Sequence, residues 1–274
     1  MLEALLAGLA GLVIGSFLNV CVFRLPRDLS VVSPRSFCPS CEKTISWHDN
    51  VPLLSFALLG GRCRYCHERI SWRYPIVELL TGIAFAAAVA ILGPSLAALK
   101  FSVFSAILIA LMATDVEERI LPDEFTLGGT TLGLILSLFV ALPPGIVGFF
   151  LPYGASWRWR SLAEAAFAAG FSSGAIWLIG FLYQKVRRRE GLGLGDVKMV
   201  AMIGAFLGMQ GVLMTLVAGS LLGAVGGSIH IVLTRKDPAT YELPFGTFLG
   251  VAALGVAVYG TLAMAWYAPG GRGL

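Results

Sequence analysis

Long apolar segments separated by short polar loops constrain the fold of this chain more than any other feature. They fall at about residues 4–23, 75–92, 97–114, 125–142, 162–183, 197–209, 211–233 and 245–267. A membrane-spanning helix needs about 20 apolar residues, and most of these segments are that long. The sixth segment is short, which indicates a half-helix or a re-entrant segment. We therefore predict an all-α polytopic membrane protein with about eight transmembrane helices embedded in the lipid bilayer.

Charge supports a membrane protein and gives its orientation. Charged residues make up 13% of the chain, against about 25% in soluble domains. Placing residues 24–74 in the cytoplasm also places the loops 115–124, 184–196 and 234–244 there. Of the 20 lysines and arginines, the other side then holds only Lys100, Arg158, Arg160 and Arg272, as the positive-inside rule requires. The chain has a net charge of +4, but its basic residues lie in loops and are sorted by membrane side. We therefore expect no nucleic-acid partner.

The one sizeable polar insertion, residues 26–74, contains two CxxC pairs, Cys38/Cys41 and Cys63/Cys66. Four thiolates at this spacing predict a tetrahedral, structural zinc site. A cytoplasmic location argues against disulfides, and a bound metal would supply folding energy to so small a segment. A c-type haem attachment at Cys63–His67 would leave the first pair unexplained. A thioredoxin-like role would need a βαβ unit that this segment cannot hold.

Two aspartates, Asp115 and Asp196, lie where apolar segments meet the predicted cytoplasmic face. The second lies in the sequence Gly193-Leu194-Gly195-Asp196, whose glycines allow a close approach of backbone. Ionisable groups at a membrane boundary are candidates for function. Two carboxylates that share a water can hydrolyse a peptide bond by acid–base catalysis. For Asp123 and Glu124, which precede an apolar segment, stabilisation of a helix N-terminus is the simpler interpretation.

Several motifs together make the chain resemble the bacterial type IV prepilin peptidases, which are GxGD aspartyl proteases. The motifs are Gly15–Val20, Arg24-Leu25-Pro26, the two CxxC pairs, Trp47–Ser55, Arg73-Tyr74-Pro75 with Glu78, Asp115, Leu121-Pro122-Asp123 and Gly193–Lys198. GxGD alone would be weak evidence, but the whole set occurs in family order and spans most of the chain.

The resemblance implies two activities in the bacterial inner membrane, with the active site facing the cytoplasm. One activity removes the basic leader peptide of type IV prepilins and type II secretion pseudopilins. The other methylates the newly exposed N-terminal residue with S-adenosylmethionine. By motif, Asp115 and Asp196 correspond to the catalytic aspartates, and the cysteines to the zinc-type domain of the bifunctional members. The expected division is a first helix (1–25), a zinc-binding, methyltransferase-associated domain (26–74) and a peptidase domain (75–274).

Two alternatives remain open from the residues themselves. A GxGD intramembrane protease without methyltransferase activity would leave the cysteine segment unexplained. A proton-coupled transporter would call for ionisable residues deeper in the helices and for internal repeats, and neither is clear. No Gly-rich dinucleotide fingerprint marks a methyl-donor site, so its residues stay unassigned. The acidic stretch 115–124 (Asp115, Glu117, Glu118, Asp123 and Glu124 against Arg119) would attract a basic leader peptide.

Overall fold

A computed structural model describes residues 1–152, 154–188, 193–234 and 244–267, and for residues 230–234 and 260–267 it describes the backbone only. Helices account for all the regular structure in these residues, apart from two isolated β-bridges. The α-helices are α1 (Leu2–Arg24), α2 (Leu54–Leu58), α3 (Arg73–Leu92), α4 (Leu96–Glu118), α5 (Asp123–Ser137), α6 (Trp157–Arg187), α7 (Leu194–Thr234) and α8 (Phe245–Tyr267). Short 3-10 helices occupy Leu25–Arg27 (η1), Trp47–Asn50 (η2) and Ile146–Phe149 (η3).

The all-α membrane fold predicted from the sequence is confirmed. Within the described residues, 5 helices are long and apolar enough to cross a membrane: α1, α3, α4, α6 and α7. Helix α5 ends at Ser137, before the predicted boundary at 142. Helix α7 covers both predicted segments 197–209 and 211–233, and its helical geometry is broken at Gly208. The predicted loop 234–244 lies almost entirely outside the described residues.

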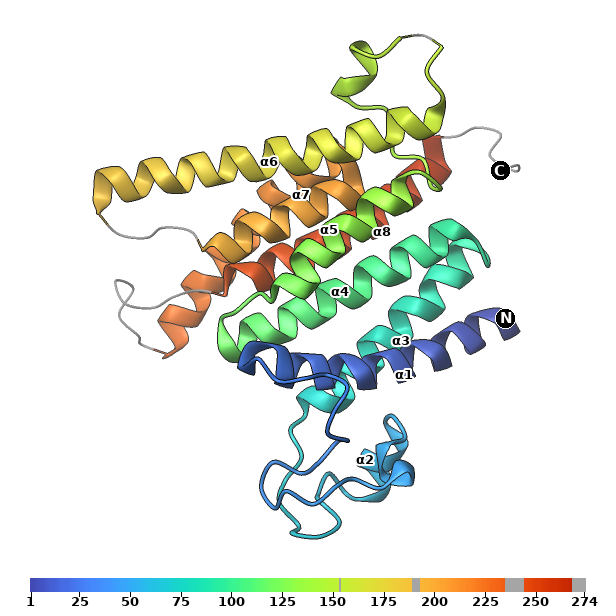
Figure 1. The fold of residues 1–274 in the computed structure, drawn as a ribbon, viewed down its shortest axis with the longest axis vertical. Helices are drawn as coiled ribbons and strands as arrows, with labels where there is room; N and C mark the ends of the chain where they lie inside the picture. The colour runs from blue at the N-terminus through green and yellow to red at the C-terminus, as the bar shows by residue number, and fades with distance from the viewer. Residues whose placement is uncertain (153, 189–192, 235–243, 268–274) are drawn as a thin grey trace. The chain divides into compact units, whose positions relative to one another are not determined.

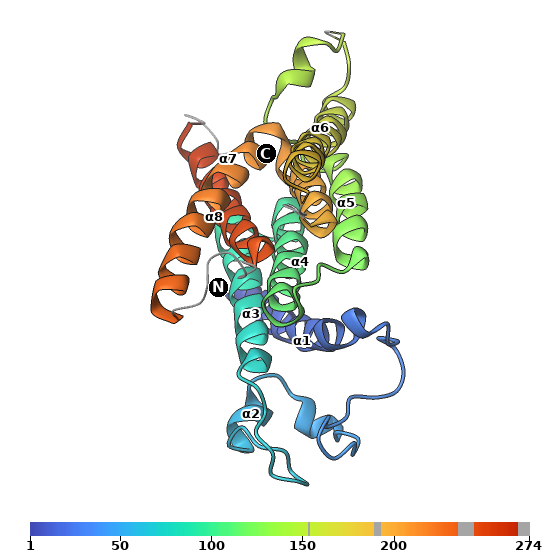
Figure 2. The ribbon, with the colours of Figure 1, turned by 90° about the vertical axis from the view of Figure 1, so that its left-hand side faces the viewer.

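The chain forms two compact units, Met1–Pro122 and Asp123–Leu274. In the first, α1 packs along α3, and α4 packs against both (Figure 1). Glycines allow this close packing, because a Cβ at Gly11 would lie 2.7 Å from the carbonyl oxygen of Thr81 and one at Gly15 would lie 2.7 Å from Glu78 Cα. The polar segment between α1 and α3, which includes α2, extends beyond the N-terminal end of α3 (Figure 2).

In the second unit, α7 is the central helix and packs against α5, α6 and α8 (Figure 1). Its first half is almost wholly buried, with Met199, Val200, Met202 and Ile203 showing 0% exposure. A Cβ at Gly204 would lie 2.8 Å from the backbone carbonyl of Ala168 in α6, so only glycine permits this helix crossing.

The break in α7 is stabilised by a buried carboxylate. Gly208 has φ 72° and ψ −176°, a conformation that is essentially restricted to glycine. Glu164 of α6 is only 4% exposed. Its Oε1 accepts the N–H of Met209 at 3.3 Å, where the helix resumes, and its Oε2 accepts the N–H of Val147 at 3.2 Å. Glu164 therefore supplies partners for backbone groups that the helix break and the loop leave unsatisfied.

We expect Glu164→Ala to destabilise the second unit, because it leaves the buried N–H of Met209 and the partly buried N–H of Val147 without this acceptor, at up to about 1–3 kcal/mol each. Thermal unfolding of the purified protein would show this as a lower midpoint. Glu3→Ala, at an exposed position on α1, is the matched control and should leave the midpoint unchanged. An unchanged midpoint for Glu164→Ala would refute this role.

Candidate functional site

The two CxxC pairs form two turns of the same design. Cys38 and Cys63 each accept a hydrogen bond at their carbonyl oxygen from the residue four positions later, Glu42 (2.8 Å) and His67 (3.0 Å). Both of those residues have a positive φ, 56° and 58°. A β-bridge closes each turn, Phe37 with Thr44 and Arg62 with Arg69. Each pair is thus presented by a local turn, and folding of the segment brings the two turns together.

The four cysteine sulfurs form one cluster. The Sγ atoms of Cys38, Cys41, Cys63 and Cys66 all lie within 4.8 Å of one another, and Cys38 Sγ is 3.8 Å from Cys66 Sγ. Zinc–sulfur bonds of about 2.3 Å give a tetrahedron with edges of about 3.8 Å. The N–H groups of Cys66 and Tyr65 lower the pKa of the Cys63 thiol to about 7, which favours the thiolate that binds metal. The sequence prediction of a four-cysteine cluster able to hold a metal ion is confirmed.

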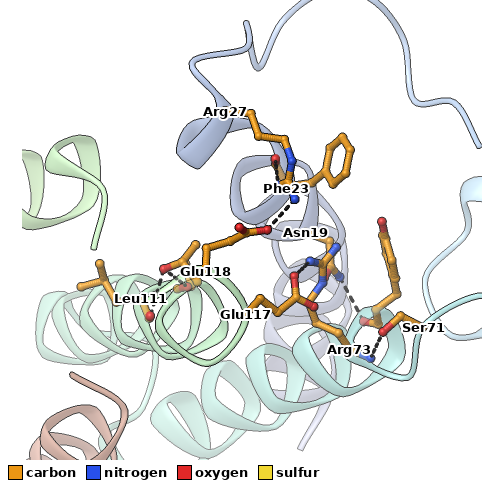
Figure 3. Close-up of polar contacts among 11 residues, drawn as sticks. Asn19, Phe23, Arg27, Ser71, Arg73, Leu111, Glu117 and Glu118 are labelled. Atoms are coloured by element: carbon orange, nitrogen blue, oxygen red, sulfur yellow. Dashed lines mark hydrogen bonds and ion pairs between the residues drawn. The ribbon is translucent and has the colours of Figure 1, made fainter. Parts of the chain in front are cut away.

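Asp115 lies in the last turn of α4 and is 6% exposed. Arg119 caps the C-terminus of the helix. It has a left-handed φ of 57° and donates its N–H to the carbonyl oxygen of Asp115. The two glutamates that follow Asp115 bind arginines of other helices in the first unit: Glu117 pairs with Arg73 of α3, and Glu118 with Arg27 of η1 (Figure 3). These pairs place Asp115 at the same end of the unit as the cysteine segment.

Asp196 lies in the first turn of α7, where it is half-buried. The carbonyl oxygen of Gly193 accepts the N–H of Asp196 at 3.2 Å. A Cβ at Gly193 would lie 3.4 Å from Asp196 Oδ2, so the carboxylate folds back over the glycine turn. Two residues further on, Lys198 Nζ donates to both carboxylate oxygens of Asp123, at 2.6 and 2.9 Å. This ion pair joins the first turns of α5 and α7, so Asp196 lies at the N-terminal end of α5.

The carboxylates of residues 115–124 are less available to a basic peptide than their number indicates. Glu117, Glu118 and Asp123 each form an ion pair with a cation from elsewhere in the chain. The charge of this stretch is therefore largely balanced within the protein. The sequence-based hypothesis that this stretch attracts a basic leader is weakened, because it counted only Arg119 as a counter-charge.

A cavity of about 410 Å³ lies in the first unit, between the cysteine segment and the adjoining ends of α1 and α3. Its apolar walls include Phe37, Ile45 and Phe56, and its polar lining includes Asn19, Asp49, Arg64, Arg73, Glu78 and Glu117. Pockets of about 300–1,000 Å³ with apolar walls and few polar groups are typical of small-molecule sites. The sequence did not predict a role for Asn19 or Glu78. Glu78 is nevertheless an ionisable residue inside an apolar span, and such residues are candidates for function.

The backbone beside this cavity is strained. Leu53, which lines the cavity, has φ 58° and ψ −45°, and the N–H of Leu54 donates to the carbonyl oxygen of Pro52 at 2.6 Å. This is the rare γ-turn with a positive central φ. The N–H of Leu53 donates to Glu78 Oε2 at 2.9 Å, which anchors the turn to α3. Strain of this kind gathers at functional sites.

The apolar helices and the four-cysteine insertion define a multi-pass membrane protein with a cysteine cluster able to hold a metal ion. Residues 9–92 match the model of the bacterial peptidase A24 N-terminal domain, and residues 102–228 match the type IV leader peptidase family. The chain belongs to this family.

Curated relatives agree along most of the chain. A prepilin leader peptidase/N-methyltransferase of Aeromonas hydrophila is 33% identical, over 94% of this chain and 91% of the relative. One of Myxococcus xanthus is 39% identical, over 84% of this chain and 64% of the relative. The type 4 prepilin-like proteins leader peptide-processing enzyme of Escherichia coli is 36% identical, over 91% of each protein. No solved structure matches the chain.

Proposed function

We propose that this protein is a bifunctional enzyme that removes the leader peptide of type IV prepilins and pseudopilins and then N-methylates the new N-terminal residue. The observation that carries the proposal is the match of both family models, together with full-length similarity to enzymes named for both activities. In this proposal the enzyme lies in the bacterial inner membrane, as the family membership implies, and the distribution of lysine and arginine orients its active site toward the cytoplasm.

Asp115 and Asp196 are the proposed catalytic pair for peptide hydrolysis. Two carboxylates around one water hold a single proton between them and titrate as a pair. The ionised aspartate takes a proton from the water as it attacks the scissile carbonyl, and the protonated aspartate donates to the carbonyl oxygen. Proton transfer to the departing amine then completes hydrolysis without a covalent intermediate. The turn at Gly193 leaves room beside Asp196 for an extended peptide backbone.

The four-cysteine cluster is proposed to hold a structural zinc ion. The ligands would be Cys38, Cys41, Cys63 and Cys66, whose spacing suits a tetrahedral site. Four thiolates leave no open coordination position, so the ion would fold residues 26–74 and would not contact substrate. In this proposal the segment belongs to the methyltransferase side of the enzyme, and the peptidase uses the helices that follow, within residues 75–274.

S-adenosylmethionine is the proposed methyl donor, and it would supply an activated methyl group to the α-amine that cleavage exposes. The test is intact-mass spectrometry of a purified prepilin incubated with the enzyme, with and without S-adenosylmethionine. We expect leader loss in both reactions and one added methyl group only when the donor is present. Cleavage without methylation would favour the alternative of a GxGD protease alone, and absence of cleavage would contradict the proposal.

A further inference from the structure

Hydrogen-bonding groups without partners line one wall of the cavity in the first unit. Asn19 is 2% exposed, and its amide nitrogen donates to the carbonyl oxygens of Gly15 (3.3 Å) and Tyr74 (3.0 Å). Two carbonyl acceptors on that side fix the orientation of the amide, because only its NH₂ group can donate to them. Asn19 Oδ1 is then left buried without a hydrogen-bond partner among the residues that the structure describes. A buried acceptor of this kind calls for a donor from a ligand or an ordered water.

Glu78 adds a buried carboxyl group to the same wall, where it accepts the N–H of Leu53. It lies one helical turn after Tyr74 in α3 and is 7% exposed. Of the other carboxylates that line the cavity, Asp49 pairs with Arg64 and Glu117 pairs with Arg73, while Glu68 is exposed. No lysine, arginine or histidine forms an ion pair with Glu78 within the described part of the chain. A buried carboxylate without a cation is costly, and a cationic ligand would remove that cost.

A donor without a partner lies beside these two acceptors. Arg73 immediately precedes Tyr74, whose carbonyl oxygen binds Asn19. Its terminal nitrogen pairs with Glu117, as Figure 3 shows, but its Nε is buried and has no acceptor in the described ranges of the chain. The wall therefore offers two acceptors, the amide oxygen of Asn19 and the carboxyl group of Glu78, and one cationic donor, Arg73. These groups lie on neighbouring turns of α1 and α3. An ammonium and a carboxylate on a single carbon complement this arrangement.

We propose that this cavity binds S-adenosylmethionine, and that Asn19 and Glu78 hold the ammonium of its amino-acid end while Arg73 Nε holds the carboxylate. The inference rests on the proposed methyltransferase function and names its donor site. The size of the cavity suits a ligand with an adenosine and an amino-acid part. The apolar walls at Phe37, Ile45 and Phe56 fit the adenosine. The α-amine of a processed pilin could satisfy the acceptors, but it has no carboxylate for Arg73.

The test compares two ligands that differ only in the amino-acid end. S-adenosylhomocysteine carries that end, and 5′-methylthioadenosine lacks it, while neither has a charged sulfur. Binding would be measured by calorimetry on the full-length protein in lipid nanodiscs, without pilin. We expect the wild type to bind S-adenosylhomocysteine at least about tenfold more tightly, the size expected for charge-assisted hydrogen bonds.

Two conservative variants test the named groups. Glu78→Gln removes the charge but keeps an acceptor for Leu53, and Arg73→Lys keeps the charge facing Glu117 but has no Nε–H. Each should weaken S-adenosylhomocysteine binding about tenfold and leave methylthioadenosine binding unchanged. Glu3→Gln, at an exposed position on α1, is the matched control and should bind both ligands as the wild type does.

Photo-crosslinking of S-adenosylmethionine to the wild type tests the site without any substitution, so its result does not depend on whether the variants fold. Labelled peptides should come from the segments that line the cavity, which are residues 16–27, 36–59 and 63–78. Labelling confined to α5–α8 would overturn the proposed site. Variants that still prefer S-adenosylhomocysteine to methylthioadenosine as strongly as the wild type does would also overturn it. Equal affinity of the wild type for the two ligands would overturn it as well. The proposed function is judged separately, because it fails only if the wild-type enzyme does not methylate a processed prepilin.

Discussion

Replacing either Asp115 or Asp196 with asparagine should reduce leader-peptide cleavage about 10³-fold, which is within the range for loss of a general acid or base. Asparagine preserves the size of the side chain but can neither hold nor transfer the shared proton. Rates would be measured from the appearance of processed pilin on purified enzyme, at saturating and subsaturating substrate. Because the lost interaction is made in the transition state, kcat should fall with little change in KM.

Asp123→Asn is the matched control for these variants. Asp123 lies in the same acidic stretch, is exposed and pairs with Lys198. Exposed ion pairs contribute about 0.2–1 kcal/mol, so this variant should cleave prepilin within a few-fold of the wild type. Equal losses in all three variants would mean that the stretch matters through its charge and not through a catalytic pair.

Removal of the metal should unfold the cysteine segment while the transmembrane helices persist. Zinc binding contributes about 10–16 kcal/mol of apparent free energy in small zinc-folded peptides. Residues 26–74 have little core of their own beyond the two turns, so they depend on the cluster. Cys38→Ser or Cys63→Ser should therefore lose the bound zinc and become sensitive to proteolysis between α1 and α3. Metal content would be measured by elemental mass spectrometry and cleavage sites by peptide mapping.

Cys21→Ser is the control for the cysteine variants. Cys21 is the fifth cysteine, buried in α1 and outside the cluster. Its variant should keep one zinc ion per chain and the wild-type proteolysis pattern. If the purified wild type contains no zinc, or if Cys63→Ser retains it, the four-thiolate site is contradicted.

The features that could be predicted from the sequence depend on local spacing. Each CxxC pair forms its own turn, so the two pairs already implied four converging sulfurs. Helix positions followed from apolar run length, and even the interruption near Gly208 was visible as a short segment. The glycine turn before Asp196 was likewise contained in four consecutive residues.

The features that could not be predicted depend on contacts between distant residues. Glu164 and Met209 are 45 positions apart, and nothing in either segment indicates that one carboxylate stabilises the break in α7. Arg73 and Glu117 are 44 positions apart, so the balance of the acidic stretch could not be read from the stretch itself. The residues of the cavity proposed to bind the methyl donor could not be predicted for the same reason, because its walls combine α1, α3 and the cysteine segment.

The central claim of the proposed function is that Asp115 and Asp196 act as a single catalytic pair. The most direct test is a double-mutant cycle on leader cleavage with Asp115→Asn, Asp196→Asn and the double variant. Groups that act as a unit are strongly non-additive, so the double variant should cleave no more slowly than either single variant. If the two losses instead multiply, the aspartates act independently and the account of a shared water and a shared proton is contradicted.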